Sequence, residues 1–253
     1  PLAAPPGYGM PTIKLAVEYD GTHYAGWQRQ LNQPTVQGAL ETAIKHVTQQ
    51  TISVAAAGRT DAGVHALGQV VSFRIDRDMP AYDWTMALNA HLPPDISVRA
   101  VDFPAPEFHA RYKATGKLYQ YRILNRSPRP ALNRQLLWHV YKSLDDAAMN
   151  QAALHLIGSH DFSSFETQPT ENEDPVCHLQ RLVVIREGDE LRIEAYADRF
   201  LKQMVRSIVG TLVEVGQGKR DPESFAAILA ARDRRKAGRT APPQGLCLMR
   251  VDY

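Results

Sequence analysis

The chain has 253 residues, 44% of them hydrophobic and 22% charged, and this composition excludes an intrinsically disordered protein. The 29 Lys and Arg residues nearly balance the 27 Asp and Glu residues, so the net charge of +2 points to no class of partner. The two cysteines, Cys177 and Cys247, exclude a disulfide framework and a four-cysteine zinc site, and we expect a reducing, cytoplasmic location.

The first half of the chain reads as strands and helices in alternation. We interpret residues 1–11 as an N-terminal extension, native or added in cloning, because residues 1–9 lack the basic flank and apolar stretch of a signal peptide. One strand places Tyr119, Tyr121 and Ile123 on a single face. The predicted elements are strands at 13–19, 52–57, 68–75, 96–103 and 118–124 and helices at 34–49 and 84–92.

The second half contains a helix, a hairpin and two further helices. Ser143 is suited to cap the first helix, with Asp145 and Asp146 in the first turn, where carboxylates are favourable. Gly188 marks the turn of the hairpin. The predicted elements are helices at 143–157, 199–215 and 222–231 and strands at 183–186, 191–197 and 246–253.

No segment predicts a membrane span. The most apolar run, residues 204–215, is shorter than the roughly 18 residues that a membrane-spanning helix needs. Arg206 and Glu214 also interrupt it. We therefore expect a protein that is not embedded in a membrane.

The order of the elements predicts an α+β fold. Strands in hairpin-like groups with helices between them favour this class over a doubly wound parallel sheet. The two halves share a strand–helix–strand–strand rhythm, which indicates two pseudo-symmetric subdomains. We place these subdomains at residues 12–110 and 111–253, as parts of one continuous unit.

Positive charge is concentrated in one stretch. Residues 108–144 contain eight Lys or Arg residues and no acid, and aromatic side chains lie between them. This combination suits a phosphate-rich ligand whose bases can stack, and it favours RNA over duplex DNA. The alternative is a solvated strand face. The candidate RNA-contacting residues of this stretch are Arg111, Lys113, Tyr119, Arg126 and Arg129.

The segment at residues 56–66, AAGRTDAGVHA, carries candidate chemistry. It lies between two predicted strands, and Gly58 and Gly63 allow tight turns and close approach to a ligand. Between them stand Arg59, a hydroxyl and the carboxylate of Asp61. Composition alone leaves two interpretations open, a reactive loop or a plain hairpin loop in which Arg59 pairs with Asp61.

The same segment resembles the signature of the tRNA pseudouridine synthase A family. The resemblance covers residues 12–253 and rests on six blocks that occur in the family's order. These blocks are EYDGT with YAGWQRQ at 18–30, GRTDAGVHA at 58–66, AR with KLYQY at 110–121, DFSSF at 161–165, FLKQMVR with IVG at 200–210, and AG with APPQG at 237–245.

The resemblance implies a fold, a reaction and a partner. It implies the family's mixed, mainly antiparallel sheet, with two pseudo-symmetric subdomains flanked by helices and a catalytic cleft between them. It also implies conversion of uridine to pseudouridine at positions 38, 39 and 40 of the tRNA anticodon stem-loop, by a homodimer. Because no outside reagent is consumed, no cofactor or metal is expected.

The resemblance also implies roles for four residues. Asp61 corresponds to the family's essential aspartate, a nucleophile or base acting at the sugar or the pyrimidine. Arg206 corresponds to the arginine that pairs with this carboxylate and keeps it ionised. Tyr119 corresponds to the aromatic residue that stacks on the target base and can accept the C5 proton. Arg59 corresponds to the arginine that fills the gap left by the extruded nucleotide.

Other interpretations of these residues exist. Without the resemblance, Arg206 reads as a side chain that extends to solvent and Tyr119 as a core residue of a strand. Competing functions are a non-catalytic RNA-binding protein and a metal-dependent phosphoesterase that uses Asp61 and His65, although no third ligand has a recognisable spacing. We expect Cys177 to be structural. The acidic segment 166–175 departs from the family pattern, and its charge disfavours contact with RNA.

Overall fold

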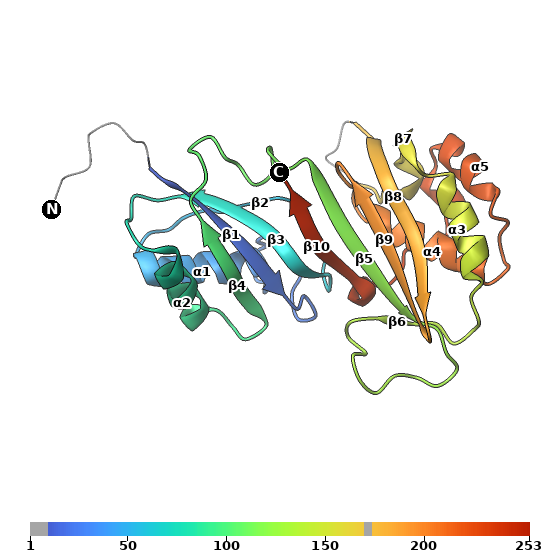
Figure 1. Cartoon of the computed structure of the whole chain (residues 1–253), viewed down its shortest axis with the longest axis horizontal. Helices are drawn as coiled ribbons and strands as arrows, with labels where there is room; N and C mark the ends of the chain where they lie inside the picture. The colour runs from blue at the N-terminus through green and yellow to red at the C-terminus, as the bar shows by residue number, and fades with distance from the viewer. Residues whose placement is uncertain (1–9, 170–173) are drawn as a thin grey trace. The chain divides into compact units, whose positions relative to one another are not determined.

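The computed structural model describes residues 10–169 and 174–253, and the chain divides into two units (Figure 1). Unit 1 ends at Ala114 and includes Tyr253, whose hydroxyl donates a hydrogen bond of 2.9 Å to Ala110 O. Unit 2 comprises Thr115–Asp252. Residues 111–114 and Tyr253, assigned from sequence to the second subdomain, thus group with the first. The expected extension 1–11 and the acidic segment 166–175 lie partly outside the described residues.

Unit 1 is an antiparallel sheet with two helices. Its strand order is β4-β1-β3, and the short strand β2 pairs with β3. The helices α1 and α2 lie beside this sheet (Figure 1). The bounds are β1 Thr12–Tyr19, α1 Val36–Thr48, β2 Ala55–Ala56, β3 His65–Arg74, α2 Ala81–His91 and β4 Ile96–Asp102.

Period-two alternation explains the central strand of unit 1. Ile13, Leu15 and Val17 on β1 are completely buried, while the residues between them are partly exposed. The neighbouring helix α1 begins after Thr35, whose side chain accepts a hydrogen bond from Gly38 N. These buried side chains give unit 1 its own hydrophobic core.

Unit 2 is a larger sheet with three helices. Its antiparallel strand order is β10-β5-β9-β8-β7, and β6 pairs with β5 in parallel. The bounds are β5 Gly116–Leu124, β6 Trp138–His139, α3 Asp146–Leu154, β7 Gly158–Asp161, β8 Val176–Glu187, β9 Glu190–Ala197, α4 Met204–Gly216, α5 Ser224–Ala231 and β10 Leu246–Asp252. Short 3₁₀ turns occupy Ser163–Phe165, Arg234–Lys236 and Pro243–Gly245.

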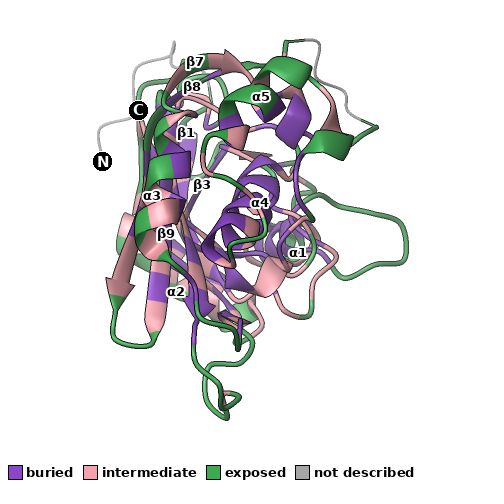
Figure 2. Cartoon of the chain, turned by 90° about the vertical axis from the view of Figure 1, so that its right-hand side faces the viewer, coloured by how far each residue is buried: buried purple, intermediate pink, exposed green. Residues whose placement is uncertain are grey.

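The helix α4 fills the core of unit 2. Figure 2 shows it almost entirely in the colour of buried residues. Met204, Ile208 and Leu212 are completely buried, and they lie on one helical face at i, i+4 spacing. Among the described residues, no helix is long and apolar enough to cross a membrane.

The predicted α+β class with mainly antiparallel strands is confirmed. Several predicted bounds are wrong. The predicted helix 199–215 begins only at Met204, because Gln203 adopts a left-handed φ of 59°. Asp145, and not Ser143, caps α3 through a hydrogen bond from Ala148 N. The strand expected at 52–57 forms a sheet pairing only at Ala55–Ala56.

Candidate active site

The loop that carries Asp61 joins β2 to β3 and is anchored at both ends. Gln69 on β3 donates a side-chain hydrogen bond of 2.8 Å to Gly58 O. The hydroxyls of Tyr19 and Thr60 lie 2.8 Å apart, and Thr60 O accepts from Trp27 N at 3.0 Å. Because Thr60 is buried and bonded on both its side chain and its carbonyl, the position of the next residue, Asp61, is fixed.

A tight turn follows Asp61. Val64 N donates to Asp61 O at 3.1 Å, and Gly63 has a φ of 75°, a conformation that glycine adopts without strain. Gly63 N also donates to Tyr24 O at 3.3 Å. The half-buried carboxylate of Asp61 is thus carried by a turn that is bonded to the rest of unit 1.

The segment 20–30 approaches this loop closely, and two glycines permit the approach. Gly26 has a φ of 100°, and a Cβ there would lie 2.7 Å from Thr60 O. A Cβ on Gly21 would lie 2.0 Å from Val64 O. Any larger residue at either position would push backbone against backbone, so these glycines are a requirement of the loop geometry.

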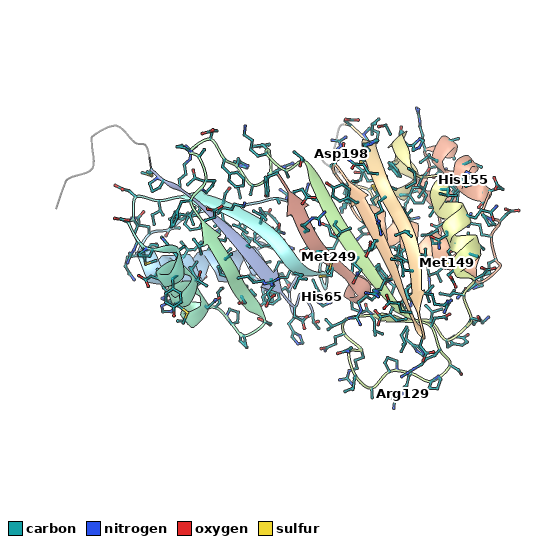
Figure 3. The ribbon with its side chains drawn as sticks, viewed as in Figure 1. His65, Arg129, Met149, His155, Asp198 and Met249 are labelled. Carbon is teal, nitrogen blue, oxygen red and sulfur yellow. The ribbon has the colours of Figure 1, made fainter. Side chains whose placement is uncertain are left out.

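His65 is buried at the start of β3, where Figure 3 labels it. Its Nδ1 accepts a hydrogen bond of 3.0 Å from Gly21 N, so it cannot also donate to the Asp20 carboxylate 3.1 Å away. We therefore assign His65 a role in holding the segment 20–30. Within residues 10–169 and 174–253, no three His, Cys, Asp or Glu side chains are grouped as ligands for a metal ion.

Tyr119 lies on β5 in unit 2, on the same buried face as Tyr121 and Ile123. The strand pairs Tyr119 with Leu248 on one side and Ala195 on the other. The ring of Tyr119 meets the ring of Phe200 edge to face, with centroids 5.1 Å apart. The strand and this contact together fix the plane of the Tyr119 ring.

Arg206 lies in the first turn of α4 and is bonded twice to one residue. Its Nε donates to Ala241 O at 2.8 Å, and its own carbonyl accepts from Ala241 N at 3.0 Å. One turn later, a Cβ on Gly210 would lie 1.7 Å from Arg239 O, so the segment 239–241 rests directly on the helix. A guanidinium held in this way does not extend loosely into solvent.

Tyr121 connects β5 to the same segment. Its hydroxyl donates to Pro242 O at 2.7 Å. Burial raises the pKa of Tyr121 far above its usual range, and the positive charges of Arg206 and Arg239 oppose this shift. Tyr121 therefore remains a neutral hydrogen-bond donor at physiological pH, and its environment includes both arginines.

The predicted RNA-contacting residues fall on both units. Arg111 and Lys113 are exposed in unit 1, as is Arg59 on the loop of Asp61. Arg126 and Arg129 lie in the loop between β5 and β6 of unit 2, and Figure 3 shows Arg129 at its outer end. Arg126 is 3.5 Å from the Asp189 carboxylate.

The structure adds supporting residues that sequence reasoning did not single out. They hold the loop of Asp61, the ring of Tyr119 and the guanidinium of Arg206. All but Gln69 belong to segments already quoted for the family resemblance, which was the available signal. These supporting residues are Tyr19, Gly26, Trp27, Gln69, Phe200 and Ala241.

Cys177 is buried on β8. Burial raises the pKa of its thiol to about 11. The side chain is therefore protonated and weakly nucleophilic at neutral pH, as expected of a structural cysteine.

Comparison with known proteins gives full-length relatives. The family described as tRNA pseudouridine synthase matches residues 15–113 and 152–253, spans that contain Asp61 and Arg206. The chain is 47% identical over 245 residues to tRNA pseudouridine synthase A of Caulobacter vibrioides, covering 96% of this chain and 99% of the relative. The proteins of the same name from Sinorhizobium fredii and Moorella thermoacetica are 44% and 47% identical over 247 and 250 residues, covering 96% of this chain and 100% of each relative.

Replacing Gly26 by Ala tests the close approach to the loop of Asp61. The matched control is Gly188→Ala, because Gly188 also has a positive φ but has no atom within 4 Å of its Cβ position. We expect the control to lose about 1–2 kcal/mol from left-handed strain alone, and Gly26→Ala to lose at least about twice as much. Thermal unfolding measures this difference, and equal shifts in Tm would show that Gly26 has no steric role.

Proposed function

The chain belongs to the tRNA pseudouridine synthase family, and we propose that it isomerises uridine to pseudouridine at positions 38, 39 and 40 of the tRNA anticodon stem-loop. The proposal extends to a cytoplasmic homodimer that uses no cofactor. The observation that carries it is the carboxylate of Asp61, held on a turn that is bonded to the rest of unit 1. A loop fixed in this way favours a reactive group over a plain hairpin connection.

The reaction makes no net change in composition. The bond between C1′ of the ribose and N1 of uracil breaks, and a bond between C1′ and C5 forms. The proton on C5 is lost to a base, and N1 gains a proton, so atoms and charge balance without an oxidant, reductant or nucleotide. A carboxylate nucleophile or base and one proton acceptor are sufficient for this chemistry.

We assign Asp61 as the nucleophile or base that begins the reaction. The family resemblance assigns Arg206 to keep this carboxylate ionised, since an adjacent positive charge favours the ionised form. Within unit 2, the guanidinium of Arg206 is oriented by Ala241 O, which lowers the entropy cost of using it. We assign Arg59, exposed beside Asp61, to occupy the space that the extruded nucleotide leaves in the RNA stack.

We assign Tyr119 two functions, as a platform for the target base and as the acceptor of the C5 proton. Its ring is held by Phe200, which suits a platform. The two functions depend on different parts of the side chain, because stacking needs the ring and proton transfer needs the phenolic oxygen.

The proposal is tested by incubating the chain with unmodified tRNA in the presence of EDTA. Release of tritium from C5-labelled uridine measures turnover, and chemical labelling of pseudouridine maps its position. We expect mass-neutral conversion at positions 38, 39 and 40. Binding of tRNA without conversion would support the non-catalytic alternative, and conversion at other positions would overturn the assigned target.

Asp61→Asn keeps the size of the side chain but removes its charge. We expect loss of essentially all turnover, with the Kd for tRNA changed by less than about tenfold, or about 1.4 kcal/mol. Asp78→Asn is the matched control, because Asp78 is exposed in the same unit and makes the same change in charge. Measurable pseudouridine formation by the Asp61 variant would exclude this carboxylate as the catalytic group.

Tyr119→Phe and Tyr119→Leu separate the two functions of Tyr119. Phe keeps the ring, and base–aromatic stacking contributes about 1–3 kcal/mol per base. We expect the Phe variant to bind tRNA normally but to turn over at least about a hundredfold more slowly, as for the loss of a general base. The Leu variant should lose turnover at least as much and also bind more weakly. A Phe variant as active as the parent would make another group the proton acceptor.

Arg126→Ala combined with Arg129→Ala tests the loop between β5 and β6. If both side chains contact phosphates, the slope of log Kd against log salt concentration should decrease by the equivalent of up to about two phosphate contacts. The interaction of Arg126 with Asp189 makes Arg129 the larger contributor. Fluorescence anisotropy at several salt concentrations measures the slope, and an unchanged slope would place the phosphate-binding face elsewhere.

A further inference from the structure

Unit 2 contains a hollow of about 380 Å³ that involves neither Tyr119 nor Arg206. Its walls come from three separate parts of the chain, namely the end of α4 with the turn that follows it, the segment after β6, and Arg239. The residues that line it include Tyr141, Lys142, Glu214, Gln217, Lys219 and Arg239. Three residues with cationic side chains therefore line one small volume.

The three cations that line this hollow form no ion pair with a carboxylate of residues 10–169 or 174–253. Glu214, the acidic residue of the lining, is already bonded, because its Oε2 accepts from Arg220 at 3.0 Å and its Oε1 accepts from Arg239 N at 3.3 Å. Among residues 10–169 and 174–253, no carboxylate forms an ion pair with Lys142, Lys219 or the Arg239 side chain. An anion placed here would meet three uncommitted charges.

Arg239 is held ready for such a contact. Its guanidinium lies 4.8 Å from the centroid of the buried Trp138 ring, a cation–π geometry. Its carbonyl rests against Gly210, which fixes the backbone. Tyr141, which also lines the hollow, is 65% exposed. A fixed guanidinium and an exposed ring together suit a nucleotide better than a simple inorganic ion.

Other arginines near the C-terminus are already bonded to acceptors in unit 2. Arg232 pairs with Asp161 at 3.0 Å, and Arg235 pairs with Asp233 at 2.8 Å. Arg234 donates to Gly238 O at 2.8 Å. Arg239 differs from these three because, among the described residues, its side chain contacts the Trp138 ring and forms no ion pair, and it is one of the residues that line the hollow.

The position of Lys219 has a simpler explanation, but this explanation does not apply to Lys142 or Arg239. Cations near the C-terminus of a helix are stabilised by its dipole, and Lys219 follows the end of α4. Lys142 and Arg239 come from other segments of the chain. The helix dipole therefore does not explain why Lys142 and Arg239 line the same hollow as Lys219.

We propose that this hollow binds one nucleotide of the substrate tRNA, with the phosphodiester on Lys142, Lys219 and Arg239 and the base or ribose against Tyr141. The inference rests on the proposed function, since it takes tRNA as the substrate. The hollow then contributes to the grip on the RNA without taking part in the isomerisation.

The test compares Lys142→Gln/Lys219→Gln with the control Lys45→Gln/Arg77→Gln. Both pairs are exposed and remove two positive charges, but Lys45 and Arg77 belong to unit 1 and do not line the hollow. We expect the first pair to raise the Kd for unmodified tRNA at least about tenfold and to reduce the salt slope by about 1.4–1.8. The control should change Kd less than about threefold, and kcat at saturating tRNA should stay unchanged for both.

Tyr141→Leu and Tyr141→Phe provide an independent measurement. Loss of the ring should weaken tRNA binding, and the Phe variant should bind as the parent does. If the Lys142→Gln/Lys219→Gln variant does not fold, these single substitutions still show whether the hollow binds tRNA. Equal Kd values and equal salt slopes for the lysine pair and its control would overturn the proposal, as would normal binding by Tyr141→Leu.

A free anion is the alternative occupant, and it is tested with inorganic phosphate and uridine monophosphate. The assignment to tRNA would be overturned by one combination of results. Phosphate or uridine monophosphate would raise the Tm of the parent but not that of the Lys142→Gln/Lys219→Gln variant, while the variant's Kd for tRNA stayed equal to the parent's. The two proposals fail separately. If the parent binds tRNA through the hollow but forms no pseudouridine, only the proposed function is overturned. If the parent is active and the Lys142→Gln/Lys219→Gln variant binds tRNA as the parent does, only the proposal for the hollow is overturned.

Discussion

The close approach of two backbone segments in unit 1 is the constraint on which the candidate catalytic loop depends. Without a Cβ at Gly26 and Gly21, the segment 20–30 can lie against Thr60 and Val64. That contact lets Trp27 N and the Tyr19 hydroxyl bond to Thr60 from two sides. A short polar loop, which would otherwise be mobile, becomes part of the rigid scaffold, and the carboxylate of Asp61 has a defined position.

Unit 2 uses the same device to position its arginines. Gly210 allows the segment 239–241 to rest on α4, and this contact supplies the carbonyl that orients Arg206. It also sets the backbone of Arg239, whose guanidinium then stacks on Trp138. A single larger residue at Gly210 would displace the supports of both arginines, so their positions are coupled through one contact.

Much of the fold could be predicted from the sequence because burial alternates with period two from Ile13 to Tyr19 on β1 and from Tyr119 to Ile123 on β5, and α1 has an amphipathic face and a cap. The start of β8 could not be predicted in this way. A register shift between Leu179 and Arg181 breaks the alternation in that strand, so its buried residues do not recur at every second position. Similarly, the left-handed Gln203 ends the apparent helical pattern before α4, and no residue type there signals it.

The candidate site shows why local sequence cannot define an accessible charge. The composition of the Asp61 loop fits a plain hairpin as well as a reactive loop, and within the sequence only the resemblance spread over the whole chain separates the two. The basic cluster at 232–239 looks uniform in sequence, yet Arg232 and Arg235 form ion pairs with carboxylates, whereas Arg239 forms none with the part of the chain that the structure describes. Lys142, almost a hundred residues away, lines the same hollow as Arg239. Charge available to a ligand is therefore a property of the folded unit, because folding decides which cations meet acids and which meet solvent.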